Sequence, residues 1–507
     1  MSQSVADVPV RGVLDHTYFS MTKSLCRVCK KSIDAKMVIR DDAVWFDKFC
    51  PKHGSQEVIV ASSAEWYLDC LTFLSPNRPP KTFKKEVSPE GCPFDCGPCA
   101  SHQQKVYLPV VSITSACNMD CPICYTVNKN DAAHQLSRED MQSILKHLLD
   151  DHEELDIINF TGGEPTLHPE LPEFLEMCRE AGIERLTIST NGSKLRDEVY
   201  VRRMAALDAR IVLSLDSFRP ETDEILLGAN TVEAKLQALE LLEKHDVTVT
   251  ILPAVAAGVN DEEVGDLFNL VMTRPNIFSL ELHTLCFTGQ GGVGFSRESR
   301  ITIPDLHRRL EESTEGQVTA KDFVPSPLAH PHCYSICYLL CLDDGGYIPF
   351  TRLISRQQLF ELLEESLYIE PREKLEMVFR DIIDGLWGEP DRIPEGEMVL
   401  KTLKRLLGEM YPPGGPQLSI TARRKIAERS AKAIYIHSHM DEESFDVGRI
   451  MKCCVGVPAP DGTNIPTCSY NVLYREKDHR FADPAMLQRM ETARQDVLAM
   501  EQPSTSK

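Results

Sequence analysis

The sequence predicts an α/β protein built around a partial (β/α)6 barrel, with cysteine-rich metal-binding regions before and after it. Two observations predict this architecture. Between residues 107 and 300, six short apolar segments alternate with amphipathic helical segments, which is typical of a parallel sheet with right-handed crossovers. Of the 18 cysteines in the 507 residues, all but three fall in five compact groups. Such grouping in a large chain indicates metal sites rather than disulfides.

The chain is expected to divide into four segments. Residues 1–85 form a rubredoxin-like or zinc-ribbon-like metal module, and residues 86–106 form an auxiliary cluster element. The barrel occupies residues 107–300. A helical insertion and a C-terminal auxiliary cluster region occupy residues 301–507. The six strands of the barrel are predicted at 108–114, 156–160, 185–189, 209–215, 247–252 and 278–283. Helices are predicted at 137–150, 170–181 and 231–244, the first with Ser137 as its N-cap.

Charge and hydropathy exclude two classes of partner. The chain has 55 basic and 76 acidic residues, a net charge of −21, which argues against binding to nucleic acid. No apolar run reaches the roughly 20 residues of a spanning helix. The first 15 residues lack the basic start and apolar core of a signal peptide. We therefore expect a cytoplasmic protein, which would meet a lipid substrate only through transient contact with the membrane surface.

The N-terminal segment carries two pairs of metal ligands. Cys26 and Cys29 form a Cys-x2-Cys pair, and Cys50 is followed three residues later by His53. The residues between the pairs alternate as in a hairpin, so the four side chains converge on one tetrahedral ion. Cys70 is the alternative to His53 as the fourth ligand. The residues do not distinguish zinc from iron, because both accept such a site.

A second cysteine group directly precedes the barrel. Cys92, Cys96 and Cys99 have Cys-x3-Cys-x2-Cys spacing, and His102 follows them. We interpret this group as the ligands of an auxiliary iron–sulfur cluster. The alternative is a mononuclear zinc site that includes His102.

The same spacing recurs where the first barrel strand ends. Cys117, Cys121 and Cys124 can ligate three irons of a [4Fe–4S] cluster and leave the fourth iron open to another molecule. A zinc knuckle or an ordinary ferredoxin cluster would need a fourth ligand nearby. The next Cys or His is His134. The spacing therefore favours a cluster that takes part in chemistry.

The second barrel strand runs into Thr-Gly-Gly-Glu-Pro, residues 161–165. Gly162 and Gly163 allow backbone carbonyls to approach a bound ammonium group, and Glu164 adds a negative charge. Sites of such barrels lie at the C-terminal ends of the strands. The other polar residues predicted there are Thr190, Asn191, Ser214 and Asp216. Glu281 and His283 alternate on the sixth strand, where they face either the site or the outside.

The C-terminal region contains the last two cysteine groups. Cysteines at i, i+4 and i+8 fit one face of a helix, and those at 453, 454 and 468 flank a turn at Asp461-Gly462. We expect the cysteines at 453, 454 and 468 to form a second auxiliary cluster together with one cysteine of the first group. The residues concerned are Cys333, Cys337, Cys341, Cys453, Cys454 and Cys468. His437 and His439 are interpreted as part of a solvated stretch rather than as metal ligands. The helical stretch 357–407 is expected to pack on the barrel and to shape an apolar channel, ordinary helical core being the alternative.

The cysteine loop at 117–124 and the Gly-Gly-Glu-Pro run together resemble the radical S-adenosylmethionine (SAM) superfamily. The wider layout resembles the archaeal tetraether lipid synthases and their homologues. The resemblance implies one SAM-binding [4Fe–4S] cluster, one or two auxiliary clusters, a mononuclear Fe or Zn ion, and an electron donor such as ferredoxin or flavodoxin. It implies cleavage of SAM to a 5′-deoxyadenosyl radical, with Tyr125 packed near the adenine. From their place at the end of the third strand, Thr190 and Asn191 are candidates for contact with the ribose, an ordinary Asn-Gly turn being the alternative.

Three functions follow as hypotheses. The leading one is an enzyme that abstracts hydrogen from an unactivated carbon of a lipid chain and couples two such carbons. The second is a SPASM-like radical SAM enzyme that modifies peptides. The third is a non-catalytic iron–sulfur electron carrier, although such a carrier has no use for the Gly-Gly-Glu edge.

Overall fold

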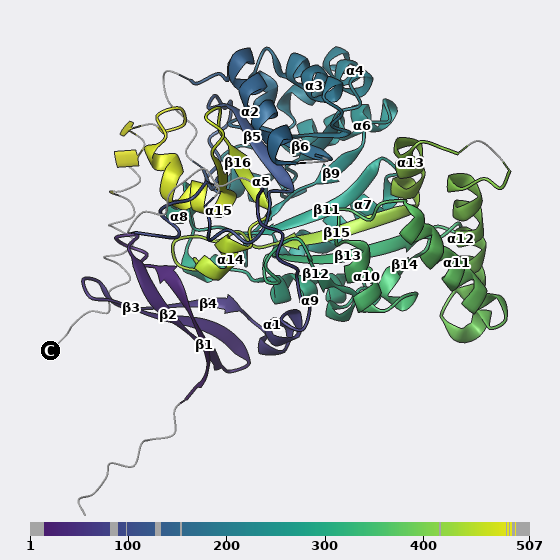
Figure 1. Cartoon of the computed structure of the whole chain (residues 1–507), viewed down its shortest axis with the longest axis horizontal. Helices are drawn as coiled ribbons and strands as arrows, with labels where there is room; N and C mark the ends of the chain where they lie inside the picture. Colours follow the sequence, from purple (N-terminus) through teal and green to yellow (C-terminus); the bar gives the residue numbers. More distant parts are fainter. Residues whose placement is uncertain are drawn as a thin grey trace, which may run out of the picture.

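The computed structural model describes residues 15–81, 90–97, 99–126, 133–152, 155–414 and 417–482, with 484–485, 487–488 and 492 beyond them. Its N-terminal part is a four-stranded antiparallel sheet in the order β1-β2-β3-β4, drawn in purple in Figure 1. The strands are β1 (Thr17–Leu25), β2 (Ser32–Arg40), β3 (Ala43–Cys50) and β4 (Gly54–Ala61). Helix α1 (Ala64–Cys70) follows and begins at the N-cap Ser63.

A large second sheet forms the body of the molecule (Figure 1). Six of its strands lie side by side in chain order, and all pair in parallel. They are β5 (Leu108–Thr114), β6 (Ile157–Gly162), β7 (Arg185–Thr190), β8 (Arg210–Leu213), β9 (Val249–Ile251) and β11 (Ile277–Thr284). The six predicted strands are confirmed, and so is the α/β fold. In the described part of the chain the sheet stays open, with β12 at one edge and β17 at the other.

The C-terminal half of the chain adds strands to both edges of this sheet. The strand β15 (Ala431–His437) pairs in parallel with β11, and β13 (Tyr334–Cys341) pairs antiparallel with β15. On the other side β16 (Val455–Pro458) lies parallel to β5. The shorter strands are β10 (Ala254–Val255), β12 (Val324–Pro325), β14 (Tyr347–Pro349) and β17 (Asn464–Pro466). The cysteines 333–341 were predicted on a helix, and this prediction is wrong. Because the strand is buried on both faces, its residues do not alternate between apolar and polar, and periodicity cannot distinguish such a run from a buried helix.

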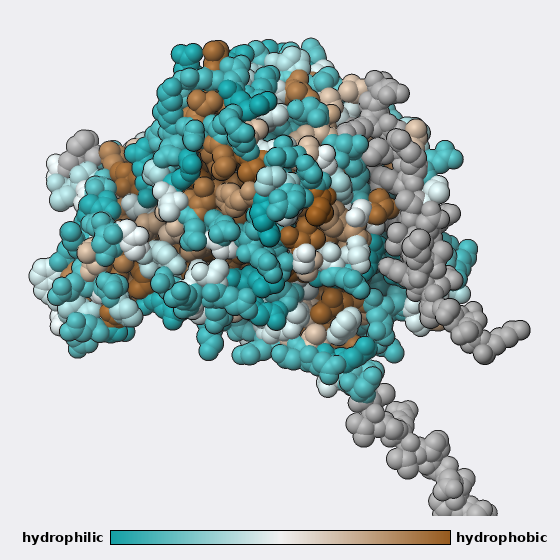
Figure 2. All heavy atoms as spheres, turned by 180° about the vertical axis from the view of Figure 1, so that it is seen from behind, coloured by the Kyte–Doolittle hydropathy of each residue, from teal (hydrophilic) through white to brown (hydrophobic). Residues whose placement is uncertain are grey.

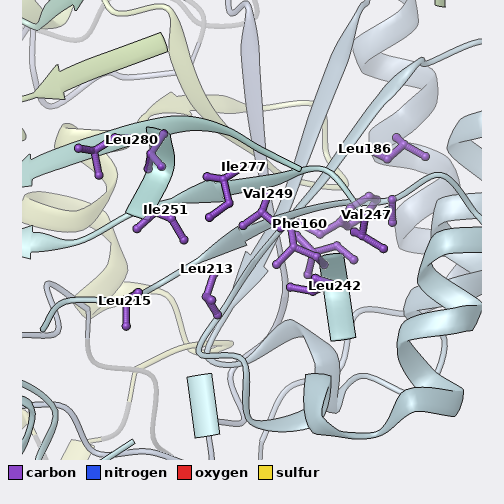
Figure 3. Close-up of a cluster of buried hydrophobic side chains, with 14 of the residues drawn as sticks. Phe160, Leu186, Leu213, Leu215, Leu242, Val247, Val249, Ile251, Ile277 and Leu280 are labelled. Atoms are coloured by element: carbon purple, nitrogen blue, oxygen red, sulfur yellow. The ribbon is translucent and has the colours of Figure 1, made fainter. Parts of the chain in front are cut away.

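Helices cover the outer face of the parallel strands. They are α2 (Arg138–Asp151), α3 (Leu171–Glu180), α4 (Glu198–Ala206), α6 (Val232–Lys244), α7 (Val264–Thr273) and α9 (Ile303–Ser313). The shorter helices α5 (Pro220–Leu227) and α8 (Gly291–Gly294) lie beside the cysteine loop instead, where Ile123 N donates to Leu226 O and Gly291 N donates to Cys124 O. The predicted cap of α2 is present, because Ser137 Oγ accepts from Asp140 N at 3.0 Å. Along β6, Ile158 and Phe160 are fully buried against the helices. Figure 3 shows Phe160 with side chains of β8, β9 and β11 beside Leu242 of α6.

A second apolar core lies under the C-terminal helices, which extend to one side in Figure 1. These helices are α10 (Arg356–Leu362), α11 (Glu373–Trp387), α12 (Gly396–Met410) and α13 (Ile420–Ser430). The short helices α14 (Val447–Met451) and α15 (Thr467–Ser469) belong to a separate apolar cluster around Phe445. The surface seen from behind is mostly hydrophilic, with apolar residues showing near the middle of that face (Figure 2). Among the described residues, no helix combines the length and hydropathy needed to cross a bilayer.

Candidate active site

A cavity of about 320 Å³ follows the inner face of the parallel sheet. At the C-terminal ends of the strands it is lined by Cys117, Cys121 and Cys124. Further along the strands it reaches Ile157 and Tyr368. The inner side chains of β6 alternate with those that face the helices, since Asn159 and Thr161 line the cavity while Phe160 is buried outside it.

The cysteine loop and the Gly-Gly-Glu run are joined by backbone contacts. Gly163 N donates to Thr114 O, and Glu164 N donates to Ala116 O, each at 2.7 Å. A Cβ on Gly163 would lie 2.2 Å from Ala116 O, and a Cβ on Gly162 would lie 2.2 Å from Thr114 O. Only glycine fits at both positions. The two motifs therefore form one rigid edge beside the three cysteines.

Replacing Gly163 by alanine should disrupt this edge. The added Cβ meets backbone rather than a flexible side chain, so we expect a loss of about 1–3 kcal/mol in the free energy of unfolding and weaker SAM binding. Urea unfolding and equilibrium SAM binding measure the two effects. Gly385→Ala is the matched control, because Gly385 lies inside α11 with open space around it. An unchanged SAM affinity in Gly163→Ala would contradict the proposed role of this edge.

Glu164 organises the neighbouring strand end. Its carboxylate, which is buried, accepts hydrogen bonds from Thr166, from Thr190 Oγ1 at 2.7 Å and from Asn191 N at 2.8 Å. Burial raises its pKa, and these hydrogen bonds counter that effect. Glu164 thus holds Thr190 and Asn191 in place, and Asn191 Nδ2 in turn donates to Asn118 Oδ1 in the cysteine loop at 2.8 Å. All of these residues except Thr166 and Asn118 line the cavity.

A buried group of charges lies where β8 ends. Lys235 Nζ, on α6, is 3.7 Å from Asp216 Oδ2 and 3.8 Å from Asp223 Oδ1. These three atoms are within ion-pair distance but beyond hydrogen-bond reach. Asp216, Lys235 and Ser214 line the cavity. Burial raises the pKa of Asp216, and the ammonium of Lys235 lowers it. Buried polar atoms without hydrogen bonds beside the cysteine loop are suited to the amino and carboxylate groups of an amino-acid ligand.

The donor set at the loop fits the open iron–sulfur cluster predicted from the sequence. Burial and the neighbouring thiolates Cys124 and Cys117 raise the pKa of Cys121. Bound iron would offset this rise in pKa, because a metal ion stabilises the deprotonated thiolate that it binds. The edge formed by Gly162 and Gly163 and the atoms near Lys235 lie around the same cavity. The residues present therefore fit both a [4Fe–4S] cluster and SAM.

A band of polar side chains continues from this edge along the inner face of the sheet. Thr187 Oγ1 and Ser189 Oγ donate to Asn159 Oδ1 at 2.9 and 3.1 Å, and Thr250 Oγ1 lies 2.8 Å from Ser279 Oγ. All five residues line the cavity. Glu281 and His283 also line the cavity. Of the two orientations left open by the sequence, toward the site or toward the outside, the structure shows the first.

Three histidines line the cavity at the ends of β11 and β15: His283, His437 and His439. The prediction that His437 and His439 belong to a solvated stretch is wrong. Burial lowers the pKa of both well below the ordinary value. The ring of Tyr125 stacks on that of His439, with 5.5 Å between centroids, and burial raises the pKa of Tyr125 to about 12.

The structure brings the N-terminal ligands together. Ligand atoms of Cys26, Cys29, Cys50 and His53 all lie within 4.8 Å of one another. Burial raises the pKa of Cys26, but hydrogen bonds from backbone N–H groups and from Gln56 dominate and lower it to about 6, which favours the thiolate that a metal needs. Cys70 lies apart, buried on α1, where burial raises its pKa to about 12. The geometry thus favours His53 as the fourth ligand.

Removal of one ligand tests this group. Cys29→Ser should lose one metal equivalent and destabilise the N-terminal sheet, since a structural ion contributes folding energy to a small module. Metal analysis of the purified protein, with hydrogen exchange over residues 17–61, measures both effects. Cys70→Ala should keep the ion. Loss of the ion in Cys70→Ala with retention in Cys29→Ser would contradict the assignment.

The other cysteine groups line two further small cavities. Cys92, Cys96, Cys99 and His102 surround one, although His102 Nε2 is 3.0 Å from the carbonyl of Cys453 and is therefore already engaged. The second is lined by Cys333, Cys453, Cys454 and Cys468. Cys337 does not line it, and lies in the main apolar core instead. Cys341, at the end of β13, is also outside it. Of the three candidates for the remaining ligand of the second auxiliary cluster, only Cys333 therefore lies beside Cys453, Cys454 and Cys468.

Several residues of the site carried only weak sequence signals. Lys235 occupies a core-facing position of a predicted helix, between Val232 and Leu239, where a lysine is unexpected. Asn159 interrupts an apolar strand at an inner position. Tyr368 and Tyr435 line the cavity but belong to no motif, so pattern reasoning had no means of finding them.

Comparisons with known proteins agree with this arrangement. Residues 111–271 match the family model of the radical SAM superfamily, and residues 18–62 match that of the HMPTM N-terminal zinc ribbon domain. The chain is 28% identical over 494 residues to 7,8-dihydro-6-hydroxymethylpterin dimethyltransferase of Methanocaldococcus jannaschii, covering 91% of this chain and 96% of that protein.

Two other similarities cover less of the chain. A probable GTP 3′,8-cyclase of Sulfolobus acidocaldarius is 27% identical over 202 residues, which span 40% of this chain and 63% of that protein. Among solved structures, SuiB of Streptococcus suis bound to S-adenosylmethionine is 18% identical, covers 42% of this chain and 48% of that chain, and has a TM-score of 0.35.

Proposed function

Since the chain contains a radical SAM domain over residues 111–271, we propose that it is a radical SAM methyltransferase whose substrate is a reduced pterin or a similar nitrogen heterocycle. The observation that carries the substrate class is the band of hydroxyl, amide and carboxylate groups along the inner face of the sheet, from Asn159 to Glu281. Similarity to a pterin dimethyltransferase over nearly the full length of both chains supports it.

The residues of the chain have separable tasks in this proposal. Cys117, Cys121 and Cys124 hold the cluster, and Gly162 and Gly163 provide the backbone edge for SAM. When bound, the cluster and SAM would supply a 5′-deoxyadenosyl radical that abstracts a hydrogen atom from a carbon of the substrate. A second SAM would donate the methyl group that replaces this hydrogen, and two electrons from the low-potential reductant would be used for each methyl group. The auxiliary cysteine groups hold further clusters, and a low-potential donor such as ferredoxin or flavodoxin supplies the electrons.

The polar band positions the substrate. Glu281, at an inner position of β11, can accept two N–H groups from the amino-pyrimidine edge of a pterin. The hydroxyls of Thr250 and Ser279 can exchange their mutual hydrogen bond for bonds to ring nitrogens. The walls nearer to Tyr368 are apolar and aromatic, which suits stacking of a planar ring.

The lipid hypothesis is a second candidate, favoured by one observation. Tyr368 lines the main cavity and also a second cavity of about 30 Å³. The walls of this second cavity are mostly apolar and include Phe278, Phe350 and Leu375. Rotation of Tyr368 would join the two cavities into a channel that suits an alkyl chain, which is the role predicted for the helical stretch 357–407.

A direct substrate comparison separates the two candidates. Cluster-loaded protein, SAM and a low-potential reductant are incubated without oxygen, either with 7,8-dihydro-6-hydroxymethylpterin or with membrane lipid extract. We expect mass spectrometry to find pterin carrying one or two additional methyl groups. Coupled lipid chains with unmodified pterin would replace the first candidate by the second.

A further inference from the structure

The three histidines of the cavity form a compact group that the proposed reaction does not use. His283 of β11 and His437 of β15 are direct partners in the parallel register, and His439 lies two residues beyond His437. One ring nitrogen from each lies within 4.8 Å of the others. The ring centroids are 5.1 Å apart for His283 and His437, 5.0 Å for His283 and His439, and 4.1 Å for His437 and His439.

This spacing is close to that of a metal site. Zinc–nitrogen bonds of about 2.0–2.1 Å in a tetrahedral site place the nitrogens about 3.4 Å apart. The ligand nitrogens of the three histidines lie within 4.8 Å of one another, so each pair can reach this separation by rotation of the rings. Neutral imidazole is the ligand form of histidine, and three imidazoles suit Zn²⁺ and related divalent first-row ions.

Neighbouring groups orient the three rings. Glu281 Oε1 lies 2.9 Å from His283 Nε2, so Nδ1 of His283 is left to face the group. Carboxylates commonly fix metal-bound histidines in this way. Tyr334 stacks on His437 at 3.9 Å with an interplanar angle of 14°. On His439, Nδ1 lies 3.6 Å from Cys468 Sγ, which leaves Nε2 as the available ligand.

We propose that His283, His437 and His439 bind one divalent first-row transition-metal ion, of which Zn²⁺ is the probe, in the wall of the cavity. Three protein ligands leave one coordination position open, as in catalytic zinc sites, and here that position faces the cavity because all three residues line it. An oxygen or nitrogen atom of the substrate would occupy it. This last assignment rests on the proposed function, whereas metal binding by the histidines does not.

Metal analysis of the holoenzyme tests the site. Cluster-loaded protein is equilibrated with Zn²⁺ without oxygen, freed of excess metal by gel filtration, and analysed for zinc, iron and sulfide. The wild type should retain one more zinc equivalent than His437→Gln or His439→Gln, with iron and sulfide unchanged. His307→Gln is the control, because His307, on α9, is also buried but pairs with Ser335 Oγ at 2.8 Å and does not line the cavity. It should retain the zinc.

The difference between the zinc-edge X-ray absorption of the wild type and that of His437→Gln supplies a second readout, because zinc held by the N-terminal ligands contributes equally to both. The additional zinc of the wild type should show nitrogen or oxygen neighbours near 2.0 Å, without sulfur neighbours near 2.3 Å. Equal zinc contents in the wild type and both variants would overturn the proposal. So would loss of iron in His439→Gln, since it would make His439 a ligand of a cluster beside Cys468. Either result leaves the methyltransferase proposal to be judged by its own products.

Discussion

Cys121→Ala is expected to lose one cluster and all SAM cleavage. Cys121 lies in the loop that also presents Cys117 and Cys124 to the cavity, and two thiolates do not retain the three-ligand coordination that leaves one iron open. Iron and sulfide should fall by the content of one [4Fe–4S] cluster. Formation of 5′-deoxyadenosine should fall to the level of protein without iron.

The control for this variant is Cys178→Ala. Cys178 is fully buried in the core on α3 and belongs to no cysteine group, so its replacement should leave iron content and SAM cleavage unchanged. Cys121→Ala protein that keeps its full iron and still cleaves SAM would show that another cysteine group holds the reactive cluster.

Lys235→Met should give the largest loss of stability. Lys235 is the cation between the buried carboxylates of Asp216 and Asp223. Its removal leaves both of them without a partner charge, which costs about 3–5 kcal/mol in the free energy of unfolding. Chemical denaturation measures this loss. Lys244→Met, at the exposed end of the same helix, is the control and should change stability by no more than about 0.5 kcal/mol.

The loss in Lys235→Met should depend on pH. Burial raises the pKa of Asp216 in the folded protein even with Lys235 present, and without the lysine the pKa rises further. A carboxyl group with a raised folded-state pKa favours folding at low pH, and this contribution disappears as the pH rises from the unfolded-state pKa through the folded-state pKa. The variant should therefore approach wild-type stability near pH 4 and fall below it towards neutral pH. A deficit that does not change with pH would contradict this account of the buried charges.

The parts of the fold found from the sequence are those with a regular pattern. The six parallel strands are short apolar runs separated by helical segments or turn signals, so their spacing was visible in the sequence. The segment around β13 was misassigned because Cys333, Cys337 and Cys341 are four residues apart, a spacing that fits one face of a helix and equally one face of a strand. The strand β15 follows a long insertion, and its place beside β11 depends on contacts between distant parts of the chain.

In the candidate site too, residues in a regular motif were found from the sequence, and residues joined only by long-range contacts were missed. Cysteine spacing indicated ligand groups, and the structure gathers Cys26, Cys29, Cys50 and His53 as expected. The histidine group was missed, because His283 lies far from His437 in the chain and only the pairing of β11 with β15 joins them. Cys337 was a candidate ligand by spacing alone, and tertiary packing places it in the core.

The most direct test of the account is the formation of 5′-deoxyadenosine by the wild-type protein. Protein with its full complement of iron and sulfide is incubated with SAM and dithionite in the absence of oxygen. We expect 5′-deoxyadenosine in the absence of substrate and an increased rate when 7,8-dihydro-6-hydroxymethylpterin is added. Fully loaded protein that forms none under either condition would contradict this expectation, and would leave the iron–sulfur electron carrier as the better description.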